Sequence, residues 1–265
     1  MESTFFLYKG IWIDKCNISH SNRLSKKECR LILNGGGKIV RNIYNWDKKE
    51  ITKFWYVIKD DFGGIDELPT KVRNQVRKSL KTYDFKIVSC SEMLNVGCEL
   101  FNKSRERFTN IPPITQEQWK KRIKMDKDSD FWIGYDRESG KPASFAINTI
   151  FEDYVDYSTM GISPDFPNNT YPMYGLIFEM NRYYLEEKKV SFVCDGARSI
   201  TEHSNIQTVL EEKFKFRKAY CDIQVFYKWW MGIAVSLLFP FRRFIGHSQV
   251  SATLRQEAWA RGLEK

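Results

Sequence analysis

Cysteine and histidine are scarce in this sequence. Six cysteines occur among 265 residues and none forms a C-x-x-C pair, while the three histidines, His20, His203 and His247, are scattered. This spacing predicts no zinc site and indicates reduced, mostly buried thiols. The N-terminus, MESTFFLYKGIW, has an acidic second residue and no long apolar stretch. It therefore predicts no signal peptide and favours a cytoplasmic protein.

The common glycine-rich phosphate loops are also missing. The run NGGGK at 34–38 has three glycines, but no G-K-[ST] follows it, so a flexible turn is predicted there. Neither a dinucleotide fingerprint nor a Ser-His-Asp order is present. These absences argue against a P-loop nucleotidase, a Rossmann dehydrogenase and a serine hydrolase.

The composition is that of a globular and strongly basic chain. Apolar residues make up 42% and aromatic residues 15%, which is enough for a substantial core. The formal net charge is +9 and the pI is about 9.1. Such a chain attracts polyanions, among them nucleic acid, anionic lipid and phosphorylated cofactors.

Periodicity divides the chain into three parts: a β-rich segment over 1–66, a mixed domain over 67–227 and an apolar and basic tail over 228–265. The mixed domain opens with a basic helix at 68–83. Ten elements follow it. The predicted strands are at 85–90, 131–136, 142–151, 154–162, 190–195 and 217–227, and the predicted helices are at 91–108, 115–125, 173–188 and 204–216. This order predicts an α/β (α+β) fold with a mixed, mostly antiparallel sheet and helices on both faces.

Two motifs within that order resemble the GNAT acyltransferase superfamily. GISPDFPNNTYP is similar to the family's passage from strand to pyrophosphate loop, with Ile162, Pro164, Asp165 and Phe166 on the matching positions. LEEKFKFRKAY, at 210–220, is similar to its closing helix-to-strand phrase. The likeness covers about 68–227. The basic helix and the preceding β-rich segment resemble the branch that includes Fem-type aminoacyl transferases.

The resemblance implies acetyl-CoA or another acyl-CoA as co-substrate and no metal. The implied cofactor-binding residues are Met160, Gly161 and Ile162 on the strand, followed by Asn168, Asn169, Thr170 and Tyr174. The loop lacks the family's glycines, but asparagine also tolerates positive φ, so the two asparagines could form a similar nest. Thr170 could cap the next helix, with Pro172 in its first turn. A rigid structural turn is the alternative.

Two carboxylates are the candidate catalytic groups. The resemblance implies a base on the strand at 154–162, and we assign it to Asp156, with a solvated carboxylate at a hairpin end as the alternative. Strand alternation predicts Asp156, Ser158 and Met160 on one face and Tyr157 and Thr159 on the other. Asp195 ends an apolar strand and either orients substrate, acts as a base through water, or caps a turn. Glu211 stands where the resemblance implies a tyrosine that protonates the leaving thiolate. Either Tyr220 or Tyr227 supplies the proton instead, or the step needs no acid from the protein.

The tail segment 228–244 carries a run of 13 uncharged residues, 229–241, bracketed by Lys228 and Arg242–Arg243. It is too short to span a bilayer, and Pro240 should end its helix. A packed helix, a protomer interface and an anchor on an anionic membrane surface stay open, the last placing the protein at the inner face of the membrane.

Three hypotheses for function follow. The first is acyl transfer from CoA to an amine on a small molecule or cell-envelope precursor. The second is a Fem-like transfer from aminoacyl-tRNA, and the third is an inactive scaffold that binds a membrane surface or nucleic acid.

Overall fold

The computed structural model describes residues 5–8, 10–14, 18–106, 112–125, 128–199, 205–246 and 249–264. Its contacts form two compact units. Unit 1 comprises 1–57, 197–205 and 218–265, and unit 2 comprises 58–196 and 206–217. The strand β4 (Phe54–Lys59) leads from unit 1 into unit 2, and β10 (Arg217–Tyr227) leads back. Unit 1 thus joins the N-terminal segment to the tail, and the three-part division made from the sequence stays a prediction.

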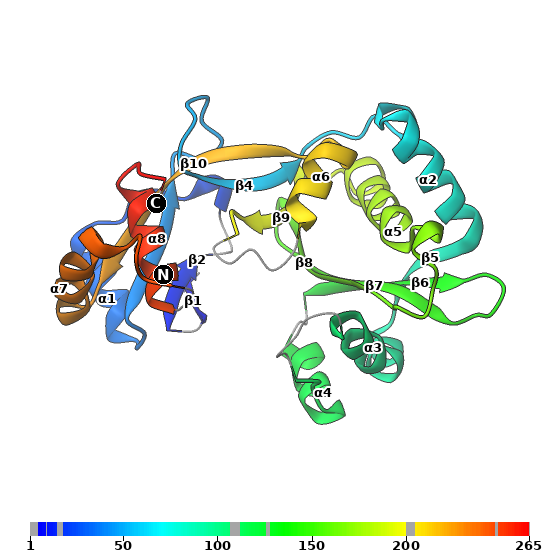
Figure 1. The fold of residues 1–265 in the computed structure, drawn as a ribbon, viewed down its shortest axis with the longest axis horizontal. Coiled ribbons are helices and arrows are strands. Elements are labelled where there is room, and N and C mark those ends of the chain that lie inside the picture. The colour runs from blue at the N-terminus through cyan, green and yellow to red at the C-terminus, as the bar shows by residue number, and fades with distance from the viewer. Residues whose placement is uncertain are drawn as a thin grey trace. The chain divides into compact units, whose positions relative to one another are not determined.

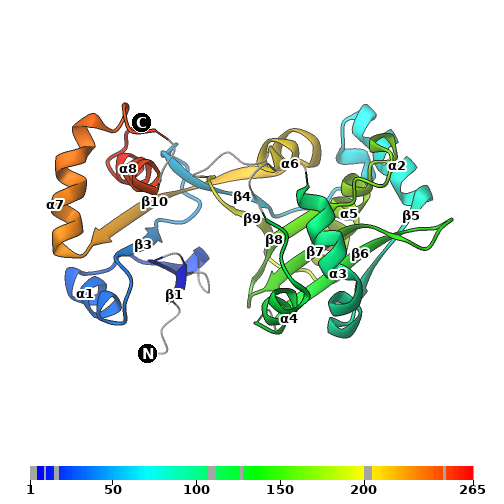
Figure 2. The same ribbon diagram turned by 60° about the horizontal axis from the view of Figure 1, so that its bottom comes forward.

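Unit 1 contains a small sheet in the order β1-β2-β3-β10 (Figures 1 and 2), from Phe5–Tyr8, Ile11–Asp14, Ile39–Tyr44 and β10. β2 and β3 run parallel, and the other pairs are antiparallel. Its helices are α1 (Lys26–Asn34), α7 (Trp229–Leu238) and α8 (Gln249–Ala260), with short η1 (Ile18–His20) and η5 (Phe239–Phe241). α7 gives way to η5 at Pro240, as predicted. The prediction of strands and turns alone over 1–66 was wrong, because it overlooked α1 and its Ser25–Glu28 capping box.

Unit 2 contains the sheet β9-β8-β7-β6-β5, from Phe192–Ala197, Tyr154–Ile162, Pro142–Ile150, Ser129–Asp136 and Tyr83–Val88. The first three strands in chain order, β5, β6 and β7, pair antiparallel, as do β7 and β8. β8 and β9 pair in parallel, since the connection between them is helical. The sheet is therefore mixed and mostly antiparallel, as predicted.

Helices cover both faces of this sheet (Figures 1 and 2). On one face α3 (Cys90–Arg105) and α4 (Gln116–Met125) form a core with Phe131 and Ile133 of β6 and their neighbours on β7. On the other face lies α5 (Pro172–Asn181), continued by the π-helical η4 (Arg182–Glu187), where the indole N–H of Trp132 donates to the Tyr184 hydroxyl at 2.8 Å. α2 (Thr70–Thr82) packs on α5. Unit 2 also contains α6 (Ile206–Phe214), η2 (Ile65–Glu67) and η3 (Asn168–Thr170).

Local contacts explain three of these placements. α3 is capped by Ser89, whose hydroxyl accepts from the Glu92 N–H at 3.1 Å, and not by Ser91, the first residue of the helix predicted at 91–108. α4 begins at a capping box, in which Thr115 and Gln118 exchange both hydrogen bonds. α2 can approach α5 closely because Gly175 has no side chain: a Cβ there would lie 2.3 Å from the Ser79 hydroxyl.

Candidate functional site

The strands β8 and β9 begin side by side and then lose their pairing. Their described register contains Tyr154–Phe192, Val155–Val193 and Asp156–Cys194. β8 continues to Ile162 and β9 to Ala197 without a further pair in that register. The edge of β8 beyond Asp156 is therefore left without a strand partner among the described residues. Such a point in an open sheet is where α/β proteins commonly bind ligands.

A β-bulge lies in β8 directly after Asp156. Ile147 pairs with Thr159, but Thr149 pairs with Asp156, so two residues of β8, Tyr157 and Ser158, oppose the single residue Asn148 of β7. Ile147 and Thr149 share one face of β7, and their partners Thr159 and Asp156 must share that face as well. The simple alternation predicted for this strand was therefore wrong. The bulge brings Asp156, Ser158 and Thr159 toward one side.

The two candidate carboxylates lie at this point of divergence. Asp156 accepts a hydrogen bond from the Ser158 hydroxyl at 2.9 Å, and Ser158 in turn contacts the Thr149 hydroxyl at 2.8 Å. Asp195, one residue beyond the last strand pair, is partly buried. Its burial, reinforced by the negative charge of Asp156 and only partly offset by a hydrogen bond from Gln207, raises the pKa of Asp195 to about 8. Nothing in the sequence alone indicated this electrostatic coupling.

Next to Asp195, within β9, Gly196 has a φ of +83°. A Cβ at that position would lie 4.0 Å from a carboxylate oxygen of Asp156. The positive φ rather than crowding explains the glycine. Asp195 therefore lies in a strand rather than in a turn.

The three strand residues predicted to contact a cofactor lie on the unpartnered part of β8. Met160, Gly161 and Ile162 pair on their other side with Ala146, Phe145 and Ser144 of β7. Gly161 is required by packing, since a Cβ there would lie 2.4 Å from the Phe145 ring and 2.7 Å from the Ser104 hydroxyl.

The loop after β8 is held by side chains of α3 and β5. Asp165 forms an ion pair with Lys103 of α3 at 2.6 Å, and this interaction lowers the pKa of Asp165. Phe166 packs edge-on against Tyr83, with ring centroids 5.9 Å apart. The acidic and aromatic positions of the motif thus fix the path of the loop.

The loop uses several of its own amides. Within η3 and the start of α5, the N–H groups of Thr170, Tyr171 and Tyr174 donate to the carbonyls of Pro167, Asn168 and Tyr171. The predicted helix cap at Thr170 was wrong: the cap position is Tyr171, in the left-handed region at φ 56°, and Pro172 is the first helical residue as expected. Asn168 and Asn169 are exposed.

Thr170 instead ties the loop to the sheet. Its hydroxyl donates to the Pro167 carbonyl at 2.5 Å and contacts the Tyr83 hydroxyl at 2.6 Å. The turn is consequently more rigid than an open glycine loop.

No family model and no curated protein matches the sequence. Solved structures with a similar fold include FemX, with a TM-score of 0.49 and 12% identity over 65% of this chain and 61% of that one. They also include L-PGS from Bacillus licheniformis, with a TM-score of 0.46 and 13% identity over 89% and 70% of the two chains. An N-acetyltransferase from Staphylococcus aureus has a TM-score of 0.32 and 11% identity over 41% and 68%. This chain spans about three fifths of the length of FemX.

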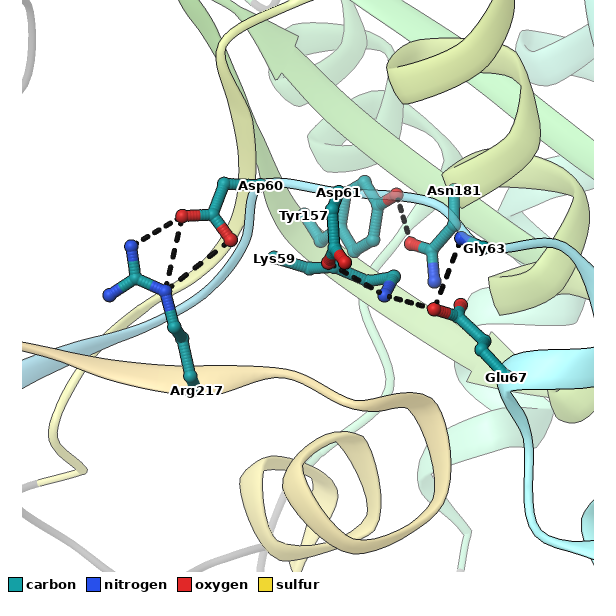
Figure 3. A network of polar contacts seen from close by, with 8 residues as sticks. All are labelled: Lys59, Asp60, Asp61, Gly63, Glu67, Tyr157, Asn181 and Arg217. Atoms are coloured by element: carbon teal, nitrogen blue, oxygen red, sulfur yellow. Dashed lines mark hydrogen bonds and ion pairs between the residues drawn. The ribbon is translucent and has the colours of Figure 1, made fainter.

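Buried polar side chains that the sequence did not indicate come from β4 and β8 (Figure 3). Lys59, at the end of β4, has no exposed side-chain surface, and its ammonium contacts Glu67 at 3.0 Å and Asp61 at 3.4 Å. The hydroxyl of Tyr157 donates to the Asn181 amide oxygen at 2.8 Å. The burial of Tyr157 raises its pKa well above its usual value, with smaller contributions from Tyr184 and Asp195.

Arg217, which matches the family's closing phrase, pairs with Asp60 in the same view (Figure 3). This contact holds the start of β10 against the segment that follows β4. For Asp60, the only signal in the sequence was a charged residue after an apolar strand, and such residues are usually solvated.

The described residues contain no group of three or more His, Cys, Asp or Glu side chains that could hold a metal ion. No helix in these ranges has the length and apolarity needed to traverse a bilayer. The five described cysteines are free thiols, and Cys16 lies outside the described residues.

Proposed function

We propose that unit 2 is an acyltransferase that moves an acyl group, acetyl in the simplest case, from CoA to an amine. The observation that carries this proposal is the parting of β8 and β9 directly beside two coupled carboxylates. The unpartnered edge of β8 offers backbone groups to a thioester, and the carboxylates offer a place to deposit a proton.

In this mechanism the pair Asp156–Asp195 accepts the proton of the acceptor ammonium, either directly or through water. The freed amine nitrogen attacks the thioester carbonyl, the C–S bond breaks, and the thiolate leaves and takes up a proton. A base with a pKa of about 8, as at Asp195, is well matched to an amine near neutral pH. The backbone of Met160, Gly161 and Ile162 would donate to the carbonyl oxygen as it gains charge. Asn168, Asn169, Thr170 and Tyr174 would then hold the pyrophosphate.

A second candidate is transfer of an aminoacyl group from tRNA, and one specific observation favours it. The loop consumes the amides of Thr170, Tyr171 and Tyr174 internally, which leaves fewer donors for a pyrophosphate. The adjoining α2 exposes four basic side chains to solvent: Lys71, Arg77, Lys78 and Lys81. Such a helix suits the phosphates of a nucleic acid.

The acceptor is, under either donor, an amine on a small molecule or cell-envelope precursor on the cytoplasmic side. The resemblance to Fem-type transferases motivates this part of the proposal. No described side chain selects one acceptor over another.

Binding measurements distinguish the two candidate donors. The purified chain is titrated with acetyl-CoA, desulfo-CoA and bulk tRNA at two salt concentrations. Saturable CoA binding supports the first donor, and salt-sensitive tRNA binding without CoA binding supports the second. Binding of neither would refute the transferase proposal and leave an inactive scaffold.

The carboxylates are tested by Asp156→Asn, with Asp128→Asn as a control. Asp128 is exposed and lies in the same unit. We expect Asp156→Asn to lower turnover by about 10²–10⁴-fold, the usual contribution of a general base, with little change in thermal stability. Unchanged turnover would remove Asp156 from the mechanism.

A further inference from the structure

Helix α7 of unit 1 is apolar on all sides, but only one side is covered. Its inner side packs on α8, where Val235 and Phe239 form a small core with Leu254 and Ala258. The hydroxyl of Tyr227, just before α7, donates to Glu257 of α8 at 2.8 Å. Figure 2 shows α7 beside α8. The packing of the tail helix on its own unit, one of the three possibilities left open by the sequence, thus accounts for only half of its apolar surface.

The other side of α7 forms an exposed apolar stripe. It follows every fourth residue along the helix and continues into the turn beyond it: Trp229, Ile233, Leu237, Phe241 and Phe244. Trp229 is 79% exposed, Leu237 69% and Phe244 86%. Trp230 and Leu238 widen it. Isolated apolar residues on a surface are ordinary, but a contiguous row of large ones indicates an interaction surface.

A basic pocket lies at the end of the stripe. A cavity of about 250 Å³ is lined by Arg242, Arg243, Arg255 and Ser251, together with Ile245, Gly246 and Leu254. Arg242 donates to the Phe239 carbonyl at 3.2 Å, while its Nε is buried without a hydrogen-bond partner in the described structure. Three guanidinium groups around one hollow match the geometry of a phosphate.

Charge around the stripe has one sign. Lys228 precedes α7, and its other end carries the arginines of the pocket. Between 228 and 263 the sequence has five basic residues and one acidic residue, Glu257. That carboxylate is already engaged by Arg261 at 2.8 Å and by Tyr227. A neutral apolar partner would gain no electrostatic attraction from these basic residues. An anionic surface with an apolar interior would interact favourably with both the basic residues and the stripe.

We propose that α7 and the turn after it dock on a bilayer that contains anionic phospholipid. The stripe enters the interface between headgroups and acyl chains, and the arginine pocket binds a lipid phosphate. Ten helical residues measure about 15 Å, half the hydrocarbon thickness, so α7 lies along the surface. Tryptophan at one end and arginine at the other suit the two levels of the interface. This proposal is independent of the activity of unit 2.

The test is cosedimentation of the full chain with vesicles. One set contains phosphatidylcholine alone and the other adds phosphatidylglycerol. Ile233→Ser/Leu237→Ser removes the centre of the stripe, and Arg243→Gln/Arg255→Gln removes two charges of the pocket. The matched controls are Leu31→Ser and Arg30→Gln on α1 of the same unit, where Leu31 is 61% exposed and Arg30 is exposed.

We expect the wild type and both controls to bind vesicles with phosphatidylglycerol more tightly than phosphatidylcholine alone. The stripe variant should lose about a hundredfold in partition into both vesicle types, because each aliphatic side chain contributes about tenfold. The arginine variant should lose about 25-fold, at about fivefold per charge, and only with phosphatidylglycerol. Soluble inorganic phosphate should compete poorly, since it cannot engage the stripe.

Three results would overturn the proposal. One is vesicle binding by the stripe variant equal to that of Leu31→Ser. Another is full competition by inorganic phosphate, which would make the pocket a site for a free anion. The third is a lipid-free dimer of the wild type that the stripe variant converts to monomer, which would show that a second copy covers the stripe.

Discussion

Replacing Asp195 by asparagine tests the electrostatics of the candidate site without any assay of activity. Burial and the charge of Asp156 raise the pKa of Asp195 from 3.8 to about 8 in the folded chain. Below pH 4 the carboxyl is protonated in both the folded and the unfolded chain and does not affect the free energy of unfolding. Between pH 4 and pH 8 the unfolded chain releases this proton and the folded chain keeps it, so the wild type loses stability as pH rises. Above pH 8 Asp195 is ionised in both states, so the loss of stability no longer changes with pH.

The size of this cost follows from the shift. Each pKa unit corresponds to about 1.4 kcal/mol, so a shift from 3.8 to about 8 sets an upper bound of about 6 kcal/mol. Asp195 is only partly buried, so water reduces the penalty to something on the order of 3 kcal/mol. Asparagine has nearly the same shape and no charge. Asp195→Asn should therefore match the wild type near pH 4 and exceed its free energy of unfolding by on the order of 3 kcal/mol at pH 9.

The assay is urea unfolding of both proteins at intervals from pH 4 to pH 9. The diagnostic quantity is the difference in the free energy of unfolding between variant and wild type, which should rise with pH and level off near pH 8. Asp156→Asn should lower the pKa of Asp195 and move that plateau to lower pH, because it removes the neighbouring charge. A difference that stays flat across the range would refute the raised pKa of Asp195, and with it the assignment of a base at this point. A plateau that Asp156→Asn leaves in place would refute the coupling of the two carboxylates.

Three further substitutions test packing, charge burial and capping through the free energy of unfolding. Gly175→Ala should cost about 1–3 kcal/mol, because its Cβ would lie 2.3 Å from the hydroxyl of Ser79. Glu67→Ala should cost about 3 kcal/mol, because it leaves the ammonium of Lys59 buried beside only an exposed partner. Ser89→Ala should cost about 1 kcal/mol through loss of the α3 cap.

Each of these three substitutions has a matched control substitution elsewhere in the chain. Gly232→Ala, in the interior of α7 with no contact closer than 3.7 Å, should stabilise by up to about 1 kcal/mol. Asp61→Ala removes the 80% exposed partner of Lys59 and should cost less than about 1 kcal/mol. Ser91→Ala removes the residue that the sequence favoured as the cap. An equal loss at Ser89 and Ser91 would contradict the observed cap.

The sheet of unit 2 was predictable because its residues follow strong local rules. β8 was predicted at its exact limits, and β5 to β7 within two residues, since β-branched and aromatic runs are bounded there by turn residues. α1 was missed although Ser25 and Glu28 form a capping box, because most of its residues are polar and only Cys29 and Leu33 are buried. The helix predicted at 91–108 was started at Ser91, whereas the observed cap is Ser89, because serines occupy both positions.

The candidate site was less accessible to the sequence, since its features depend on pairing between distant strands. A β-bulge depends on the register between two strands and has no signature in the sequence of either one. The face of the sheet on which Thr159 lies could therefore not be predicted from strand alternation. The coupling of Asp195 to Asp156 requires β9 to lie beside β8, 38 residues apart at the pair Asp156–Cys194. Lys59 looks like any solvated lysine until Glu67 is brought against it.

The donor question rests on the turn between β8 and α5, and the physical chemistry of that turn restricts the answers. A glycine loop binds pyrophosphate because its amides point outward at a helix N-terminus. Here η3 turns the amides of Thr170 and Tyr171 onto carbonyls of the loop, and Pro172 has no N–H at the first helical position. Any anionic carrier must then be held mainly by other groups: the amides of Asn168 and Asn169, or the cations on the neighbouring α2. CoA binding without help from α2 would favour the asparagines, whereas loss of donor binding on neutralising Lys78 and Lys81 would favour a carrier with an extended phosphate backbone, because a single pyrophosphate does not need a row of cations along a helix.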